Sequence, residues 1–317
     1  MKKIFIDGSA GTTGLRIQER LAQRRDLQLV TLTGELRKDA AARKDAINSA
    51  DIVFLCLPDD AARESAAMVE NDHTVIIDTS TAHRTAPGWT YGFAEIGGRR
   101  EQIRTARQIA NPGCHASGFI SLVAPLTEAG VLAPDVQIPC FSLTGYSGGG
   151  KKMIADYESE KTEENAAHKQ LLTGPRMYGL GQQHKHLPEM AKICGLAKDP
   201  VFCPVVGDFY AGMEVVVQLF ASDLSVGVRE IGEIYAAYYA REKGGLVHFA
   251  DGADEDGFLS AAAFAGRDDM QVSVWGNQER ILLVSRFDNL GKGASGAAIQ
   301  NMNLVMGIEE KTGLVWE

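Results

Sequence analysis

The chain has 317 residues, of which 45% are hydrophobic and 23% are charged, and its formal net charge is −9. This length predicts about two domains with ordinary globular cores. The excess of acidic residues excludes nucleic acid as a general partner, because a phosphate backbone requires a basic face.

The cellular setting that the sequence predicts is cytoplasmic. The five cysteines are odd in number and include no Cys-x-x-Cys pair, which is typical of a reducing compartment rather than of a disulfide framework. Asp7 ends the N-terminal apolar run too early for a secretion signal, and no apolar run reaches membrane-spanning length. We therefore expect a small-molecule substrate, with neither a membrane nor nucleic acid as partner.

The first elements predict a dinucleotide-binding site. A strand over residues 3–6 is followed by a glycine-rich turn and by a helix with the apolar residues Leu15, Ile17 and Leu21. In such sites the glycines let the backbone approach a pyrophosphate at the helix N-terminus. A loop that only permits close packing of helix on strand is the alternative. The predicted turn consists of Gly8, Ser9, Ala10, Gly11, Thr12, Thr13 and Gly14.

Charged residues after the second predicted strand (27–33) indicate which dinucleotide binds. Glu35 could hold ribose hydroxyls, as in NAD enzymes, whereas Arg37 and Lys38 could receive the 2′-phosphate of NADP. The two basic residues favour NADP, and solvated loop charges are the alternative.

Two further predicted strands, over residues 51–57 and 75–78, are almost continuously apolar, as expected for a parallel sheet covered on both faces. Ligands of such sheets bind at the carboxyl ends of the strands. We assign Arg84, beyond the second of them, to an anionic group of the substrate, with a surface ion pair as the alternative. The residues assigned to the cofactor at these ends are Leu57, Pro58 and Ser80.

The segment Asn111–His115 carries the predicted nucleophile. A last strand over residues 108–110 leads into a Pro-Gly turn, and the apolar spacing from Phe119 to Leu126 predicts one face of a helix. Cys114 would lie at the helix N-terminus, where unpaired N–H groups and the helix dipole stabilise a thiolate. The alternative is that Cys114 only packs in the interior.

The predicted strand over residues 136–144 runs into three consecutive glycines and two lysines (148–152). Such a loop could wrap a phosphate or a carboxylate, or it could form a mobile loop at an interface. Residues 156–170 are polar and predict a surface excursion.

His184 and His186 follow. A zinc site is one interpretation, but Cys194 and Cys203 do not complete a tetrahedral set at a recognisable spacing, so we predict no metal. Proton transfer to the chemistry of Cys114 is the other interpretation. Pro188 favours an extended conformation, which would turn both rings to one face. Glu189 could fix His186 as a binding group, which favours His184 for the proton.

The remaining pattern predicts a second domain with an antiparallel sheet. Strands over residues 201–209 and 213–221, a helix over 229–241 and a hairpin over 270–287 suit subunit contacts. The closing helix (294–308) has small residues on its apolar face and is expected to pack on the first domain. The predicted domains are therefore 1–113 with 290–317, and 114–289.

Together these segments resemble the semialdehyde dehydrogenase group and, within it, the family of N-acetyl-gamma-glutamyl-phosphate reductases in their shorter, second form. The resemblance covers nearly the whole chain, and five motifs occur in the family's order. The matching segments are 8–14, 111–114, 145–150, 184–189, and 288–294 with 300–303.

The resemblance implies an α/β fold: a Rossmann-type dinucleotide-binding domain and an α+β catalytic and dimerisation domain, as in glyceraldehyde-phosphate dehydrogenase. It implies that the Cys114 thiolate attacks N-acetyl-L-glutamyl 5-phosphate, and that NADPH reduces the resulting thioester to the 5-semialdehyde in arginine biosynthesis. A homo-oligomer, dimer or tetramer, is expected. Asn289 is assigned to the cofactor. The residues assigned to the substrate are Asn111, Arg84, Ser147, Gly148, Lys151 and Glu189.

Three other interpretations remain open at this point. Aspartate-semialdehyde dehydrogenase is the nearest rival within the group. A non-catalytic NADP-binding regulator would leave Cys114 as inert packing, and a zinc hydrolase would use the two histidines.

Overall fold

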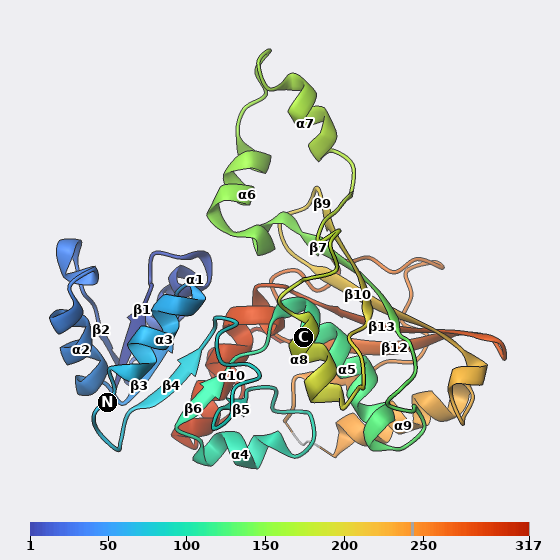
Figure 1. Cartoon of the computed structure of the whole chain (residues 1–317), viewed down its shortest axis with the longest axis horizontal. Helices are drawn as coiled ribbons and strands as arrows, with labels where there is room; N and C mark the ends of the chain where they lie inside the picture. The colour runs from blue at the N-terminus through green and yellow to red at the C-terminus, as the bar shows by residue number, and fades with distance from the viewer. Residues whose placement is uncertain (242–243, 317) are drawn as a thin grey trace. The chain divides into compact units, whose positions relative to one another are not determined.

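The computed structural model describes residues 1–241 and 244–316. The chain divides into two compact units (Figure 1). Unit 1 contains Met1–Ala94, Gly98–Gly113 and Ala294–Leu314, and unit 2 contains Glu95–Gly97, Cys114–Gly293 and the residues from 315 on. Residues 290–293, which the sequence assigned to the dinucleotide domain, lie in unit 2, where Lys292 forms a buried ion pair with Glu95 at 2.8 Å.

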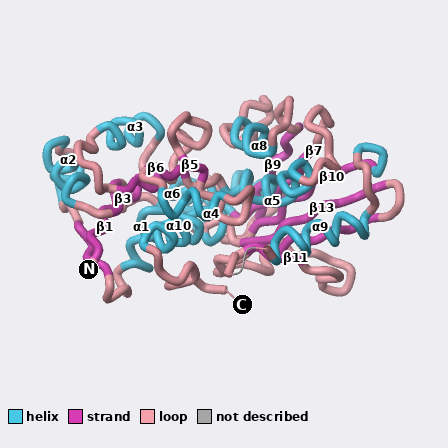
Figure 2. The backbone as a smooth tube through the Cα atoms, turned by 90° about the horizontal axis from the view of Figure 1, so that it is seen from below, coloured by secondary structure: helices cyan, strands magenta, loops and turns pink. Residues whose placement is uncertain are grey.

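Unit 1 is built on a six-stranded, fully parallel sheet in the order β2-β1-β3-β4-β6-β5. Helices α2 and α3 lie on one face of this sheet, and α1 and α10 lie on the other (Figure 2). Because both faces are covered, strands such as β3 are buried throughout, as the sequence predicted. The strands are β1 (Lys2–Asp7), β2 (Leu27–Val30), β3 (Ile52–Leu55), β4 (Val75–Asp78), β5 (Thr90–Tyr91) and β6 (Gln108–Ala110).

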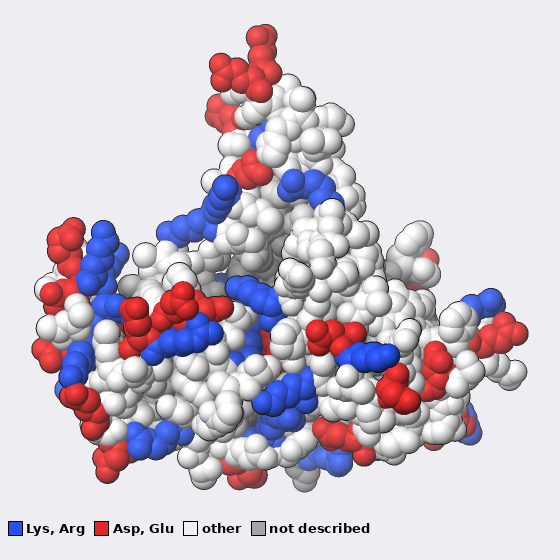
Figure 3. All heavy atoms as spheres, viewed as in Figure 1, with Lys and Arg blue, Asp and Glu red and all other residues white. Residues whose placement is uncertain are grey.

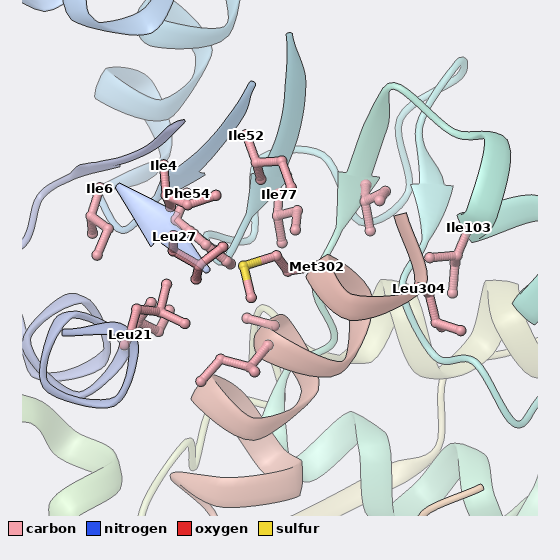
Figure 4. Packing of buried hydrophobic residues seen from close by; sticks show 14 of the residues in the cluster. Ile4, Ile6, Leu21, Leu27, Ile52, Phe54, Ile77, Ile103, Met302 and Leu304 are labelled. Atoms are coloured by element: carbon pink, nitrogen blue, oxygen red, sulfur yellow. The ribbon is translucent and has the colours of Figure 1, made fainter. Parts of the chain in front are cut away.

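The C-terminal helix returns to unit 1 and completes its core, which confirms that expectation. Ala298 and Met302 of α10 are buried in the same cluster as Ile4 and Phe54 of the sheet (Figure 4). Leu15 departs from the predicted apolar face of α1 and is 43% exposed. The helices of unit 1 are α1 (Thr12–Leu21), η1 (Gly34–Arg37), α2 (Ala40–Ser49), α3 (Asp59–Ala67), α4 (Arg99–Thr105) and α10 (Gly296–Met306).

Unit 2 is built on a seven-stranded mixed sheet in the order β11-β12-β13-β10-β7-β9-β8. The predicted hairpin forms from β12 and β13. The predicted strands at 201–209 and 213–221 also form, but β7 lies between them, parallel to β9 and antiparallel to β10. The strands are β7 (Pro139–Gly145), β8 (Arg176–Met177), β9 (Val201–Gly207), β10 (Met213–Phe220), β11 (Val247–Phe249), β12 (Met270–Gly276) and β13 (Arg280–Phe287).

Helix α5 contacts β10 and β13 and is flanked by α8 and α9. Its residues 115–126 are all buried, so the predicted one-sided apolar face is wrong: neighbours cover the helix on every side. The helices of this unit are α5 (Cys114–Glu128), η2 (Tyr146–Gly149), α6 (Gly150–Glu158), α7 (Ala166–Leu172), α8 (Leu187–Cys194), η3 (Ala221–Asp223) and α9 (Val228–Ala240). The π-helical turn η4 (Gly291–Ser295) contains the last residues of this segment of unit 2 and the first residues of the C-terminal segment of unit 1.

The predicted surface excursion forms two short helices, α6 and α7, which project from the sheet of unit 2 (Figure 1). The connection between them contains the exposed residues Glu160, Glu163 and Glu164, and acidic side chains gather at the tip of this segment (Figure 3). Within the described residues, no helix combines the length and the apolar character needed to cross a bilayer.

Candidate active site

Cys114 is the first residue of α5, directly after the Asn-Pro-Gly turn, as predicted. Its side chain is half-buried. Gly293, in the part of the π-helical turn η4 that belongs to unit 2, lies close to it: a Cβ atom built on Gly293 would lie 2.9 Å from Cys114 Cβ. A helix N-terminus presents N–H groups and positive potential to a thiolate, so this position suits a nucleophilic sulfur.

Three histidines and a tyrosine gather around the start of α5 in unit 2. The ring of His115 lies 5.6 Å from the rings of both His184 and His186, and the latter two are 4.7 Å apart. Tyr178 Oη lies 2.6 Å from His115 Nε2. Burial raises the pKa of Tyr178, and the negative charge of the Cys114 thiolate raises it further, which places this hydroxyl in the electrostatic range of the sulfur.

His115 and Tyr178 were not among the predicted functional residues. Burial lowers the pKa of His115 to about 3, with a smaller contribution from His184, so the ring is neutral at physiological pH. The only sequence signal for His115 was its position next to Cys114. Tyr178 follows strand β8 and has no sequence signal of its own.

The local structure of the His184–Glu189 segment differs from the prediction. His186 is the N-cap of α8 with helical backbone angles, and Pro188 lies in the first turn, where its missing N–H leaves no hydrogen bond unmade. The expected extended conformation is therefore wrong, although the two rings still lie together. The backbone N–H of His186 donates to His184 Nδ1 at 3.2 Å, and His186 Nε2 lies 4.0 Å from Glu189 Oε1.

The glycine-rich segment after β7 is held by Asn289. Its Nδ2 donates to Ser147 Oγ, and its Oδ1 accepts from the N–H of Gly212, both at 3.0 Å. A Cβ on Gly148 would lie 3.3 Å from the same amide. The structure thus brings together, in unit 2, Asn289, which was assigned to the cofactor, and Ser147 and Gly148, which were assigned to the substrate. Lys151 is exposed on α6.

Asn111 and Arg84 lie together in unit 1, at the end of strand β6. Asn111 Nδ2 donates to the carbonyl of Ala294 at 3.0 Å, and its Oδ1 accepts from Asn301 Nδ2 at 3.1 Å. Arg84 Nε donates to the Asn111 carbonyl at 3.0 Å, and its guanidinium also donates to the carbonyl of Thr79. Both side chains therefore fix the backbone that leads into the Pro-Gly turn.

The predicted dinucleotide site coincides with a pocket of about 360 Å³ in unit 1. Arg37 and Lys38 line it together with the start of the glycine turn, although they are distant in sequence from that turn. Arg43, which the sequence analysis missed, also lines the pocket and is held by Asp7 at 3.0 Å. The predicted residues that line the pocket are Gly8, Ser9, Ala10, Arg37, Lys38 and Leu57.

Different positions of this turn require glycine for different reasons. Gly8 has φ +91°, and a Cβ there would lie 2.2 Å from the Cys56 carbonyl oxygen, so a side chain does not fit. A Cβ on Gly14 would lie 2.5 Å from the Gly8 oxygen, which shows that this glycine serves close packing of α1. Gly11 is the N-cap of α1, followed by Thr12 and Thr13 in its first turn. The turn thus serves backbone access and packing at once.

Pro58 and Ser80 do not line this pocket. Pro58 is the exposed N-cap of α3. The hydroxyl of Ser80 donates to Asp78 Oδ2 at 2.8 Å, and the same carboxylate contacts His83, so the side chain of Ser80 stabilises its own loop. Among the described residues, no group of three or more His, Cys, Asp or Glu side chains is arranged to hold a metal ion.

Models of two protein domains match the chain. Residues 3–106 match the NAD binding domain of semialdehyde dehydrogenase, and residues 114–289 match its dimerisation domain. Solved structures agree in fold: aspartate semialdehyde dehydrogenase II of Vibrio cholerae, complexed with ASA, has a TM-score of 0.69 at 17% identity and covers 97% of this chain and 98% of its own. Aspartate semialdehyde dehydrogenase of Candida albicans, solved with NADP, has a TM-score of 0.67 at 14% identity, with 97% and 99% covered.

Relatives of known name are much more similar in sequence. N-acetyl-gamma-glutamyl-phosphate reductase 2 of Nostoc sp. is 46% identical, over 98% of this chain and 99% of that protein. The N-acetyl-gamma-glutamyl-phosphate reductase of Sinorhizobium medicae is 45% identical, over 96% and 98%. The chain therefore belongs to the semialdehyde dehydrogenase family and, within it, to the N-acetyl-gamma-glutamyl-phosphate reductases.

Proposed function

We propose that the protein reduces N-acetyl-L-glutamyl 5-phosphate to N-acetyl-L-glutamate 5-semialdehyde and phosphate, a step of arginine biosynthesis, with NADPH as reductant. The observation that carries this proposal is the half-buried Cys114 at the N-terminus of α5, beside three histidines, in a chain 46% identical to a reductase of that name. The aspartate-semialdehyde alternative is disfavoured, because the enzymes of that name are only 14–17% identical to this chain.

In the first half of the reaction, the acyl group is transferred from the substrate to Cys114. Its thiolate forms a bond to the acyl carbon while the carbon–oxygen bond to phosphate breaks, which leaves a thioester on the enzyme and releases phosphate. The bound nicotinamide supplies the hydride that converts the thioester to the aldehyde level. When the tetrahedral oxyanion collapses, the carbon–sulfur bond breaks and the thiolate is restored. One proton is consumed overall, and it ends on the released phosphate.

We propose distinct roles for the two histidines of the 184–189 segment. Because His184 Nδ1 accepts a hydrogen bond from the backbone, the neutral ring carries its proton on Nε2 and can donate a hydrogen bond to an oxyanion. His186 Nε2 lies 4.0 Å from the carboxylate of Glu189, and we assign His186 as the proton donor to phosphate. This assignment reverses the preference for His184 that the sequence suggested.

We further propose that NADP is the preferred dinucleotide. Arg37 and Lys38 bring two positive charges to the pocket of unit 1, which suits a 2′-phosphate, whereas the charge of Arg43 is balanced by Asp7. Replacing Arg37 and Lys38 by alanine should weaken NADPH binding much more than NADH binding, by about 1.5–3 kcal/mol for each lost charged hydrogen bond. Titration by fluorescence measures both affinities, and equal weakening would contradict the assignment.

The reaction itself is tested in the reverse direction. The purified protein should reduce NADP in the presence of phosphate and N-acetylglutamate semialdehyde, and much more slowly with aspartate semialdehyde. Cys114→Ser should fold and bind NADPH but lose turnover, because a hydroxyl is a far poorer nucleophile at neutral pH. Mass spectrometry should find the acyl adduct on Cys114 and on none of the other four cysteines. Cofactor binding without turnover in the wild type would support the regulator interpretation instead.

The dimerisation domain of unit 2 indicates an oligomer, which we propose is a homodimer or a homotetramer. All five cysteines are free thiols, which supports a reducing compartment such as the cytoplasm. Native mass spectrometry of the full chain would establish the number of subunits.

A further inference from the structure

Ser142, His115 and Tyr178 form a chain of hydrogen bonds whose central residue, His115, directly follows the predicted nucleophile Cys114 on α5. His115 Nδ1 lies 2.6 Å from Ser142 Oγ, and His115 Nε2 lies 2.6 Å from Tyr178 Oη. Ser142 is fully buried and His115 is 3% exposed. The arrangement uses three neighbouring strands: Ser142 on β7 pairs with Pro204 on β9, and the N–H of Tyr178, just after β8, donates to the carbonyl of Pro204.

The hydrogen bonds that join Ser142, His115 and Tyr178 can run in either of two directions, depending on which groups donate. A neutral imidazole has one N–H donor and one acceptor nitrogen. In one arrangement Tyr178 donates to Nε2, and the Nδ1–H donates to Ser142. In the other, Ser142 donates to Nδ1, and the Nε2–H donates to the oxygen of Tyr178.

The burial of Ser142 decides between these directions. In the described part of the chain, His115 is the one hydrogen-bond partner of the Ser142 side chain. If His115 donated to Ser142, the hydroxyl proton of Ser142 would be buried without an acceptor, which is costly. If Ser142 donates instead, its proton is satisfied, and the unused proton is that of Tyr178, which is half-buried rather than fully buried. The low pKa of His115 keeps the ring neutral, as both directions require.

We propose that Ser142 fixes His115 as the Nε2–H tautomer, and that His115 in turn makes Tyr178 a hydrogen-bond donor toward the reaction centre at Cys114. Ser142 and His115 are therefore positioning residues. The role of Tyr178 rests on the proposed function: its O–H proton would stabilise the oxyanion that forms when the acyl carbon becomes tetrahedral. A Tyr178 that donated to His115 would instead present only an oxygen lone pair to that negative charge.

The tautomer of His115 can be determined by a measurement that does not depend on enzyme activity. Long-range proton–nitrogen NMR spectra of the full-length wild type identify which ring nitrogen of each histidine carries the proton, and the loss of one set of signals in His115→Gln assigns His115. A proton on Nε2 supports the proposal, and a proton on Nδ1 overturns it. This measurement stands even if the enzyme shows no turnover of the proposed substrate, an outcome that would overturn the proposed function alone.

The consequence for turnover is tested by a double-mutant cycle with Ser142→Ala and Tyr178→Phe. Tyr178→Phe should lower kcat by roughly 10²–10³-fold, as when one oxyanion donor is removed. Ser142→Ala should lower kcat by about 2–10-fold with little change in KM, the effect of one neutral hydrogen bond. In the Tyr178→Phe background, Ser142→Ala should have no further effect on kcat.

A buried serine elsewhere in unit 2 supplies the matched control. Ser121 on α5 is fully buried and donates to the Gly118 carbonyl at 2.7 Å. Ser121→Ala should change stability without changing kcat, so a general effect of a lost buried hydroxyl would be visible. Equal loss of kcat from Ser142→Ala in both backgrounds, or unchanged kcat in Tyr178→Phe, would overturn the proposal.

Discussion

The packing around Cys114 leaves no room for even one additional carbon atom at position 293. Gly293 approaches the Cys114 side chain so closely that even a methyl group would contact Cβ of the cysteine at 2.9 Å. The glycine lies in a π-helical turn, a feature that occurs often at functional sites. We infer that the absence of a side chain at position 293 maintains the position of the sulfur.

Gly293→Ala should therefore reduce turnover more than stability. The added methyl group must displace Cys114 or the turn by several tenths of an ångström, and misplacement of a reacting group of about 1 Å can cost about 10²-fold in rate. Steady-state kinetics and thermal unfolding measure the two effects. Gly174→Ala is the control, because nothing lies within 4 Å of a Cβ there. Wild-type kcat in Gly293→Ala would contradict this inference.

The assignment of the two histidines makes a second prediction at this scale. His186→Gln should lower kcat by about 10²–10⁴-fold with KM little changed, because it removes the proton donor. His184→Gln should have a smaller effect, because the glutamine amide can still donate a hydrogen bond. Glu189→Gln should reproduce part of the His186 defect. Steady-state kinetics of the three variants separate these cases, and a larger loss of kcat in His184→Gln than in His186→Gln would exchange the roles.

At the scale of elements, α10 is the piece that closes unit 1. It lies late in the sequence but contributes Ala298, Met302 and Leu304 to the core formed by the first strands. Small residues on its buried face allow close approach to its neighbours. The stability of the dinucleotide-binding unit therefore depends on a segment nearly two hundred positions after the last strand of that unit.

Ala298→Leu should lower the stability of unit 1. The residue is fully buried, so three additional carbon atoms must be accommodated by shifts of packed side chains, at a cost of about 1–3 kcal/mol. Thermal unfolding with and without NADPH measures the effect. Ala41→Leu on α2 is the control, because Ala41 is exposed. An unchanged melting temperature in Ala298→Leu would show that this interface tolerates the added volume.

At the scale of the whole molecule, buried His115 links folding to pH. Its pKa is lowered to about 3 by burial, whereas the unfolded chain takes up a proton on this ring below about pH 6.5. The neutral ring therefore contributes no penalty above pH 6.5, and stability is lost progressively as the pH falls from 6.5 toward 3. The maximum slope for one proton is about 1.4 kcal/mol per pH unit.

Urea unfolding of the wild type and of His115→Gln at pH 7.5, 6.0 and 5.0 tests this linkage. The variant should lose less stability than the wild type between pH 6.0 and 5.0, because it has no ring to protonate on unfolding. Its absolute stability differs because hydrogen bonds are lost, so the dependence on pH is the measured quantity. Parallel pH curves for the two proteins would contradict the low pKa.

Much of this protein is determined by the sequence itself. The parallel strands, the glycine turn before α1 and Cys114 at the start of α5 are all local features, because apolar periodicity, backbone freedom and helix-terminal N–H groups act over a few residues. The tertiary structure alone decided that His115, Ser142 and Tyr178 meet, that Arg37, Lys38 and Arg43 line a pocket with the distant glycine turn, and that α5 is covered on every side. The first of these contacts depends on strand order, which places β7, β9 and β8 side by side although helices α6, α7 and α8 lie among them in the sequence. Residues distant in the chain show no common pattern until the sheet brings them together.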